Sequence, residues 1–229
     1  KGRCICIAFF FVLIEQMYNF HHLFGLPVLL YQLDPITFNR EEIIQTIQNN
    51  FEKQNKRQEW QKNFFDTNIH HSLKDEKNQN FETPDYSKLK LAYETPIKTY
   101  IKNMNFKKNC FVTYEIVNYT ASKNESFMEP HLHTGCDLSL IHYLKFNKNQ
   151  HSPTVFMNPY SHNDYWEDKS KFVSNLEGNR MNAWAWDQWR YGVNEGDLLI
   201  FPAFLKHFVK NYNSDELRIT ISANIQLKF

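Results

Sequence analysis

The sequence of 229 residues predicts a mainly β domain with flanking helices, of the α+β class, and two changes of pattern along the chain support this prediction. Between about residues 39 and 104, apolar residues recur at helical spacing in two stretches. Beyond about residue 111, apolar and polar residues alternate, as they do in half-buried strands. Two helices followed by six or more short strands favour an antiparallel sandwich packed against helices, and a jelly roll fits the number of strands.

The first half of the domain is predicted to contain one strand and two helices. Residues 27–33 are mostly apolar and are expected to form a strand that ends at Asp34-Pro35. Asn39 stands three residues before Glu42, as in a capping box, and marks the start of the first helix. The second helix is expected from about Tyr86 to Met104, with an apolar face directed at the core.

The ends and the polar segments of this half complete the domain organisation. Residues 53–84 are polar and are expected to form surface structure with a short helix, in which the pair His70-His71 is solvated. Lys1 and Arg3 precede the apolar run 4–14, which is too short to span a bilayer. We expect residues 1–16 to lie outside a single folded domain of residues 17–229, and a signal peptide is the alternative interpretation.

The second half of the chain is predicted to supply the strands of the core, over about residues 111–227. Each expected strand combines alternating or continuous apolar residues with turn residues at its ends. The expected strands are Phe111–Tyr119, Asp137–Phe146, Thr154–Met157, Asp197–Phe201, Lys206–Lys210 and Leu217–Leu227.

Composition excludes several classes of partner. The 26 basic and 25 acidic residues give a net charge of +1, so no strong field favours nucleic acid or an anionic membrane surface.

The cysteines, at positions 4, 6, 110 and 136, show neither a CxxC pair nor the spacing of a disulfide framework. Cys136 is interpreted as a small apolar residue. A reducing, cytoplasmic location fits this usage, and secretion is the alternative if residues 1–16 act as a signal.

The most informative motif is Pro130-His131-Leu132-His133. Two histidines separated by one residue on an extended segment point to the same side, so both can reach one metal ion. Burying two unpaired imidazoles is unfavourable unless a metal or hydrogen bonds compensate them. Surface histidines at the entrance of a strand are the alternative interpretation.

A second group of residues downstream supports a metal site. Residues 195–202 form a turn that leads into an apolar strand ending at Pro202, and His207 follows. Eleven residues later, Arg218 begins a strand on which Thr220, Ser222 and Asn224 share its face. A half-exposed strand explains this alternation without any function. An arginine at the mouth of a cavity is also suited to bind a carboxylate in a bidentate manner.

Together these segments resemble a little-characterised branch of the iron(II)- and 2-oxoglutarate-dependent oxygenases. Members of that branch carry His-x-His-Pro-Gly, then a Ser-Gly-x-Tyr-Tyr strand, a Gly-Asp-Leu-x-x-Phe-Pro turn, a distal histidine and Arg-x-Ser-x-Ser-x-Asn. The resemblance covers about residues 24–226 and is most specific after Pro130. The matching segments here are His131-Leu132-His133-Thr134-Gly135, Leu138–Leu144, Gly196–Pro202, His207 and Arg218–Asn224.

The resemblance implies a cupin-like jelly roll, the double-stranded β-helix, that holds one ferrous ion. By this resemblance His131 and His207 are metal ligands, and Arg218 binds the distal carboxylate of 2-oxoglutarate, with Thr220 supporting it. Tyr143 is expected to contact the cosubstrate from a central strand. The implied activity is that of a dioxygenase, hydroxylation of a small-molecule or peptide substrate with release of succinate and CO2.

One position departs from the pattern of the wider superfamily. The usual iron site has two histidines and a carboxylate, written His-x-Asp or His-x-Glu on the first metal strand. Here the second position of that motif is His133, and we expect His133 to be the third ligand. Asp137 is the alternative, because it has the right parity if the strand continues through Gly135. Thr134 and Leu140 also replace the usual proline and glycine of the family.

An aromatic insertion, about residues 160–191, separates the two parts of the site. Long ordered loops in compact domains often form lids, and we expect this one to contact substrate. A hydrophobic cluster that closes one end of the sandwich is the alternative. The tryptophans expected to contribute are Trp166, Trp184, Trp186 and Trp189.

Two other functions are compatible with the motifs. A cupin-type dioxygenase uses three histidines without 2-oxoglutarate, and the presence of Arg218 favours the 2-oxoglutarate interpretation over it. A jelly-roll binding or structural protein would use the histidines only for its fold. Such a protein would bind no specific metal, and its Arg218 would have no need to face His207.

Overall fold

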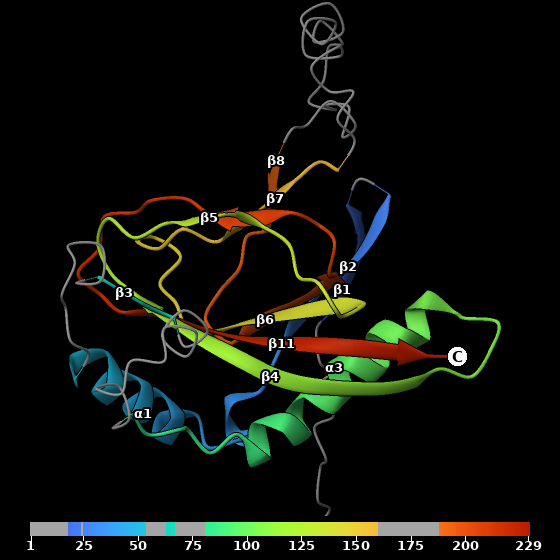
Figure 1. The fold of residues 1–229 in the computed structure, drawn as a ribbon, viewed down its shortest axis with the longest axis horizontal. Helices are drawn as coiled ribbons and strands as arrows, with labels where there is room; N and C mark the ends of the chain where they lie inside the picture. Colours follow the sequence, from blue (N-terminus) through green and yellow to red (C-terminus); the bar gives the residue numbers. More distant parts are fainter. Residues whose placement is uncertain (1–17, 24, 54–62, 67–80, 160–187) are drawn as a thin grey trace, which may run out of the picture.

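The computed structural model describes residues 18–23, 25–53, 63–66, 81–159 and 188–229, and these residues form two antiparallel sheets that face each other. Figure 1 shows the larger sheet between the helices and the smaller sheet. The prediction of a mainly β, antiparallel jelly roll with flanking helices is confirmed. Prediction and structure agree because alternating apolar residues on successive strands require a covered face.

The larger sheet has seven strands and the smaller sheet has four. The seven strands, in spatial order, are β1 (Tyr18–Leu23), β2 (Leu26–Gln32), β9 (Asp197–Pro202), β6 (Leu138–Lys145), β11 (Arg218–Lys228), β4 (Phe111–Ser122) and β3 (Phe64–Asp66). The four strands, in spatial order, are β5 (Met128–His131), β10 (His207–Val209), β7 (Thr154–Met157) and β8 (Gln188–Arg190).

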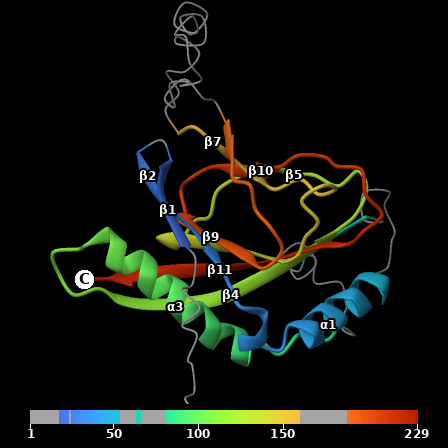
Figure 2. The same cartoon turned by 180° about the vertical axis from the view of Figure 1, so that it is seen from behind.

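Helices cover the outer face of the seven-stranded sheet. A short 3-10 helix, η1 (Pro35–Thr37), leads into α1 (Arg40–Lys53), and α3 (Ser87–Met104) lies farther along the same face. Figure 2 shows from behind that both long helices lie on the side of this sheet that is turned away from β5 and β10. Among the described residues, no helix is both long enough and apolar enough to cross a membrane.

The central strands are buried on both faces, which explains their nearly continuous apolar sequences. On β6 and β9, Leu140 and Ile200 pack toward the helices, whereas Tyr143 and Phe201 pack toward the four-stranded sheet. Ile219, Ile221, Ala223 and Ile225 of β11 likewise belong to the core cluster beneath the helices. Residues of opposite parity on β11 are therefore directed into the space between the sheets.

Most of the predicted elements are confirmed, with boundaries shifted by a few residues. The expected strand over residues 27–33 is β2, and the expected helices are α1 and α3. The six strands expected after residue 111 correspond to β4, β6, β7, β9, β10 and β11. Residues 1–16, which were expected to lie outside the domain, and the pair His70-His71 are not among the described residues.

Four short strands were not predicted, namely β1, β3, β5 and β8. The prediction that residues 53–84 are polar surface structure is wrong at β3, where Phe65 and Asp66 are buried against β4. Three residues are too few to show alternation, so only pairing with a neighbouring strand defines such an element.

The expected capping box at the start of α1 is only partly present. Asn39 does precede the helix, but its Nδ2 donates to the side chain of Glu42 and to the carbonyl oxygen of Asp85. In a capping box the side-chain oxygen would instead accept from a backbone N–H. The start of α1 is therefore tied to the segment that precedes α3.

His142 is buried on the helix side of β6. Its Nδ1 lies 3.0 Å from the hydroxyl of Tyr93 on α3, and its Nε2 has no hydrogen-bond partner among the described residues. Burial, together with the positive charge of Arg40, lowers the pKa of His142 to about 3. The ring is therefore neutral in the folded protein across the neutral and mildly acidic range.

We expect His142 to make the protein less stable in acid. Above about pH 6.5 the ring is neutral in both the folded and the unfolded chain, so it adds no pH dependence. Below that pH the unfolded chain takes up a proton that the folded protein excludes, which lowers the free energy of unfolding by up to about 1.4 kcal/mol per pH unit. The free energy of unfolding, measured with urea between pH 7 and pH 4.5, should decrease less steeply with falling pH in His142→Phe than in the wild type. Equal slopes for the wild type and this variant would contradict the assignment.

Candidate metal and cosubstrate site

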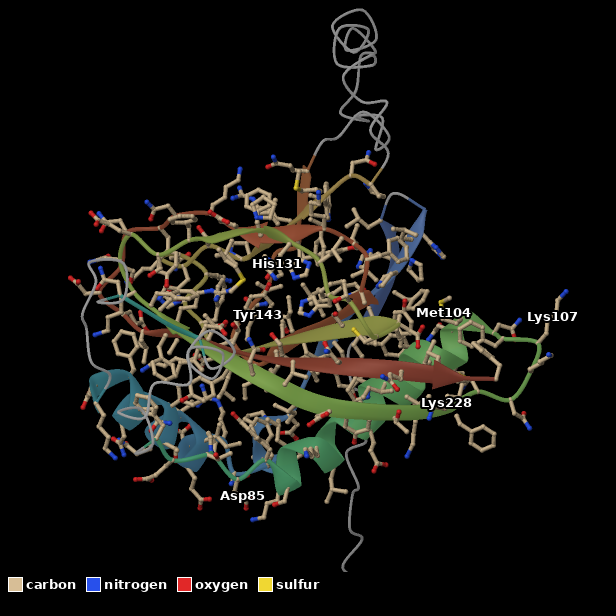
Figure 3. All side chains as sticks on the ribbon, in the orientation of Figure 1. Asp85, Met104, Lys107, His131, Tyr143 and Lys228 are labelled. Atoms are coloured by element: carbon tan, nitrogen blue, oxygen red, sulfur yellow. The ribbon has the colours of Figure 1, made fainter. Side chains whose placement is uncertain are left out.

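The pairing of β5 with β10 places two histidines directly opposite each other. His131 ends β5 and His207 begins β10, and they are partners in the antiparallel register. Their ring centroids are 4.3 Å apart. His131 and His207 are far apart in the sequence, and the pairing of β5 with β10 brings them together. Figure 3 labels His131 in the space between the two sheets.

His133 completes a group of three imidazoles. It follows β5, and its backbone N–H donates to the carbonyl oxygen of Ala203 in the turn before β10. Its ring lies parallel to that of His207, at 5.2 Å between centroids. One ligand atom from each of His131, His133 and His207 lies within 4.8 Å of the other two. The predicted convergence of these three residues is present in the structure.

Hydrogen bonds to backbone carbonyls fix the tautomers of two of these rings. Nδ1 of His131 lies 2.8 Å from the carbonyl oxygen of Glu129, and Nδ1 of His207 lies 2.9 Å from that of Leu205. A carbonyl oxygen only accepts, so each Nδ1 carries the proton and each Nε2 keeps a lone pair. This arrangement orients metal-binding histidines in proteins generally.

The environment keeps the rings of His207 and His133 neutral. Burial lowers the pKa of His207 to about 3, and the neighbouring His131 adds to this effect. Burial also lowers the pKa of His133, His131 contributes in the same direction, and the side chain of Asn224 opposes the change. Protons therefore do not compete with a metal for the lone pairs of His207 and His133 near neutral pH.

Asp137, the alternative third ligand, lies elsewhere. Gly135 has a positive φ of 79°, so the extended chain that begins at His131 turns before it reaches Asp137. The Asp137 carboxylate accepts from the backbone N–H of Leu227 at 2.7 Å. Among the described residues, the group of close metal-ligating atoms contains three histidines and no carboxylate.

Arg218 lies deep between the sheets at the start of β11. It is only 2% exposed, its Nε donates to the carbonyl oxygen of Ser152, and its Nη1 lies 3.4 Å from Oγ1 of Thr220. The rings of Tyr143 and Phe146 flank the guanidinium, with centroids 5.7 and 5.9 Å away. Burial lowers the pKa of Arg218, although arginine remains charged in proteins. A buried cation held by neutral groups is suited to receive an anion.

A cavity of about 980 Å³ connects the histidines to Arg218. Cross-strand register builds one wall, because Thr220 pairs with Thr120 of β4 and Ser222 pairs with Asn118. The lining residues nearest the predicted site are His131, His133, His207, Thr154, Arg218, Thr220 and Ser222. A volume of this size accommodates a small cosubstrate together with part of a substrate.

The remaining predicted residues have different positions. Thr220 lines the cavity, whereas Tyr143 is fully buried and is absent from the lining. The Tyr143 hydroxyl accepts from the backbone N–H of Thr154, and its ring supports Arg218. Figure 3 labels Tyr143 above the seven-stranded sheet. Its contribution in the structure is thus to shape the surroundings of Arg218.

Of the four tryptophans expected in a lid, Trp166, Trp184 and Trp186 lie outside the described residues. Trp189 is part of β8, is partly buried and packs against the core cluster between the sheets. Its ring contacts Tyr191 edge to face, at 6.3 Å between centroids. Trp189 therefore packs as expected under the alternative interpretation, in which the aromatic residues form a hydrophobic cluster.

Sequence reasoning missed several residues of the site. Thr154 and Asn118 line the cavity, and Asn224 lies beside His133. Asn224 could have been found from the sequence, because the alternation on β11 places it on the same face as Arg218. No such signal marked Thr154, because its place depends on the pairing of β7 with β10.

The three imidazoles fit a divalent transition metal such as iron. Imidazole nitrogen is a suitable donor for Fe, Ni, Cu and Zn, whereas Mg²⁺ and Ca²⁺ prefer oxygen. Three protein ligands leave further coordination positions of a metal for a cosubstrate or substrate. Arg218, which opens on the same cavity, adds a carboxylate-binding group to this donor set.

Comparisons with known proteins agree with this chemistry. Residues 118–224 match a protein family described as "Putative 2OG-Fe(II) oxygenase". No curated protein matches the chain.

Several solved structures are similar to this chain at low identity. One is a 2OG-Fe(II) oxygenase family oxidoreductase from Burkholderia pseudomallei (10% identity, TM-score 0.45, 86% of this chain and 84% of that chain covered). Another is a Pseudomonas putida prolyl-4-hydroxylase (10% identity, TM-score 0.43, 94% of this chain and 95% of that chain covered). A third is the viral collagen prolyl hydroxylase of Paramecium Bursaria Chlorella virus-1 (10% identity, TM-score 0.42, 92% of this chain and 96% of that chain covered).

The family match spans the strands that carry the histidines and Arg218. It includes β5, β6, β9 and β10, and it ends within β11 at residue 224. Both parts of the site that were predicted from the sequence therefore fall inside it. Residues 118–224 of this chain, which hold both parts of the site, therefore match a family model of 2OG-Fe(II) oxygenases.

Proposed function

We propose that this protein is a dioxygenase that hydroxylates a small molecule or a peptide, with conversion of 2-oxoglutarate to succinate and CO2. The observation that carries the proposal is that three imidazoles and a buried arginine open on one cavity. A metal-binding group and a carboxylate-binding group at the same cavity suit a cosubstrate that has both a chelating end and a distal carboxylate.

Each group has a distinct part in the proposal. His131, His133 and His207 would hold the iron, and Arg218 with Thr220 would bind the distal carboxylate of 2-oxoglutarate. Iron held by these residues would activate O2. Of the four electrons that O2 takes up, oxidative decarboxylation of 2-oxoglutarate would supply two and the hydroxylated substrate the other two, so that one oxygen atom enters succinate and the other the substrate.

The protein residues orient and desolvate the reactants. Arg218 is held by the Ser152 carbonyl and by two aromatic rings, so its guanidinium is oriented before any ligand binds. Such prior orientation reduces the entropy lost on binding. Low exposure also strengthens the attraction between a guanidinium and a carboxylate.

A site of three imidazoles has one more positive charge than the usual site of two histidines and a carboxylate. Anionic ligands such as 2-oxoglutarate should therefore bind more strongly to the metal-loaded protein, because a negative ligand has been replaced by a neutral one. The same donor set is found in cupin-type dioxygenases that do not use 2-oxoglutarate, and this observation favours such an activity as the second candidate.

Binding and turnover of 2-oxoglutarate test the proposal directly. We expect the protein, prepared without oxygen and mixed with Fe(II) and 2-oxoglutarate, to develop the weak visible charge-transfer band of the chelate. Admission of O2 should then produce succinate. Iron binding without the band and without succinate would exclude 2-oxoglutarate and favour the cupin-type candidate.

The identity of the metal ligands can be tested by substitution. We expect His207→Ala to lower metal affinity by at least about 100-fold, because His207 is the buried central member of the triad. His133→Ala should have a similar effect. Asp137→Asn is the matched control and should change metal affinity by less than about threefold. Calorimetry with Fe(II) or Co(II) measures all three, and a larger loss in Asp137→Asn than in His133→Ala would reverse the assignment.

Arg218→Ala should separate cosubstrate binding from metal binding. We expect the dissociation constant for 2-oxoglutarate to rise by roughly 10- to 1000-fold, as for the loss of a buried charge-assisted pair of about 1.5 to 4 kcal/mol. Metal affinity should stay within a few-fold of the wild type, since Arg218 offers no ligand atom. An unchanged constant for 2-oxoglutarate in a folded variant would show that the carboxylate lies elsewhere.

A further inference from the structure

We propose that His151 is a positioning residue for cosubstrate binding, because its imidazole joins the two segments that hold the Arg218 guanidinium. This inference rests on the proposed function of Arg218. His151 lies in the turn between β6 and β7 and is 4% exposed. It lies outside the histidine triad, and it was not among the residues expected to form the site.

Both ring nitrogens of His151 are engaged, and their partners define its tautomer. Nδ1 accepts from the backbone N–H of Asn147 at 3.0 Å, so it cannot carry a proton. Nε2 lies 3.0 Å from the carbonyl oxygen of Glu216, which only accepts, so Nε2 carries the proton and donates it. The ring thus acts as a neutral bridge between a donor and an acceptor.

The two ends of this bridge are adjacent to Arg218 in different ways. Asn147 and His151 close the turn whose next residue, Ser152, accepts from Nε of Arg218. Glu216 precedes Arg218 by two residues in the chain that enters β11. His151 therefore links the segment that carries the guanidinium to the segment that carries its acceptor, next to the pairing of Ile219 with Lys145.

Other contacts between the two segments are weaker substitutes for this link. Nδ2 of Asn147 donates to the Glu216 carboxylate, and Oγ of Ser214 donates to the Gln150 side chain. The bond between Asn147 and Glu216 is exposed, and hydrogen bonds at the surface contribute little because water competes for them. Ser214 is buried, but its acceptor Gln150 is exposed. His151 is enclosed by the rings of Phe146 and Tyr212, so its bonds are shielded from water.

The charges around His151 also favour the neutral ring. Burial lowers the pKa of His151, Arg218 and Lys145 act in the same direction, and the Glu216 backbone carbonyl and carboxylate oppose them. Tyr212 is the other titratable group that contacts the ring. A protonated ring would place a second donor against the Asn147 N–H and a second cation beside Arg218, so the neutral form is the one that maintains the bridge.

Two substitutions each retain half of the bridge. The side-chain amide of asparagine reaches about as far as Nδ1 of histidine, and that of glutamine about as far as Nε2. His151→Asn therefore keeps an acceptor for Asn147 but loses the donor to Glu216, whereas His151→Gln keeps that donor. Gln150→Ala is the matched control, because it removes an outer contact between the same two segments.

The dissociation constant for 2-oxoglutarate of Fe(II)-loaded protein, measured without oxygen, is the main readout. We expect His151→Asn to raise it about tenfold, because a buried carbonyl acceptor loses its donor, with a smaller rise in His151→Gln. Gln150→Ala should remain within about twofold of the wild type. Metal affinity and kcat at saturating 2-oxoglutarate should change little in all variants, so that the defect lies in KM.

The possible outcomes separate this inference from the proposed function. If the wild type fails to bind 2-oxoglutarate, both are wrong. If the wild type binds 2-oxoglutarate, and His151→Asn and His151→Gln both bind it as tightly as the wild type does, only the role of His151 is wrong. A loss of metal affinity that parallels the loss of 2-oxoglutarate affinity would indicate a general effect on folding and would overturn the positioning role.

Discussion

The antiparallel register between β5 and β10 is the constraint on which the site depends. It sets His131 opposite His207, and the backbone bond from His133 to Ala203 then brings the third imidazole to the same point. A shift of one residue in this register would direct His207 away from the cavity, since successive side chains on a strand point to opposite faces. The helices and the seven-stranded sheet serve to hold these two short strands at a fixed distance from Arg218.

Much of the fold could be predicted because long elements carry a periodic pattern. The alternation on β11 and the helical spacing in α3 were sufficient to place both elements and to assign their buried faces. The short strands β3, β5 and β8 could not be predicted in this way, since three or four residues are compatible with any local structure. Their conformation is determined by the strands with which they pair.

The site shows the same division between local and long-range information. His131, His133, His207 and Arg218 could be grouped from their motifs, and the close approach of the three imidazoles is present in the structure. The competition between His133 and Asp137 could not be decided, because it depends on the left-handed backbone at Gly135. Thr154 and His151 could not be found, because neither lies in a sequence motif and only the folded chain brings Thr154 to the cavity and His151 to Glu216.

The position of β5 at the edge of the four-stranded sheet has a consequence for how a metal can reach its ligands. Among the described residues this strand has one hydrogen-bonded neighbour, β10, and none of its four side chains is fully buried, so it can separate from the sheet with little effect on the main core. His131 would move with it, whereas His207 would stay anchored in the interior. Loading and loss of metal can thus proceed through local opening of one edge, and a bound ion would in turn fasten that edge to the rest of the sheet.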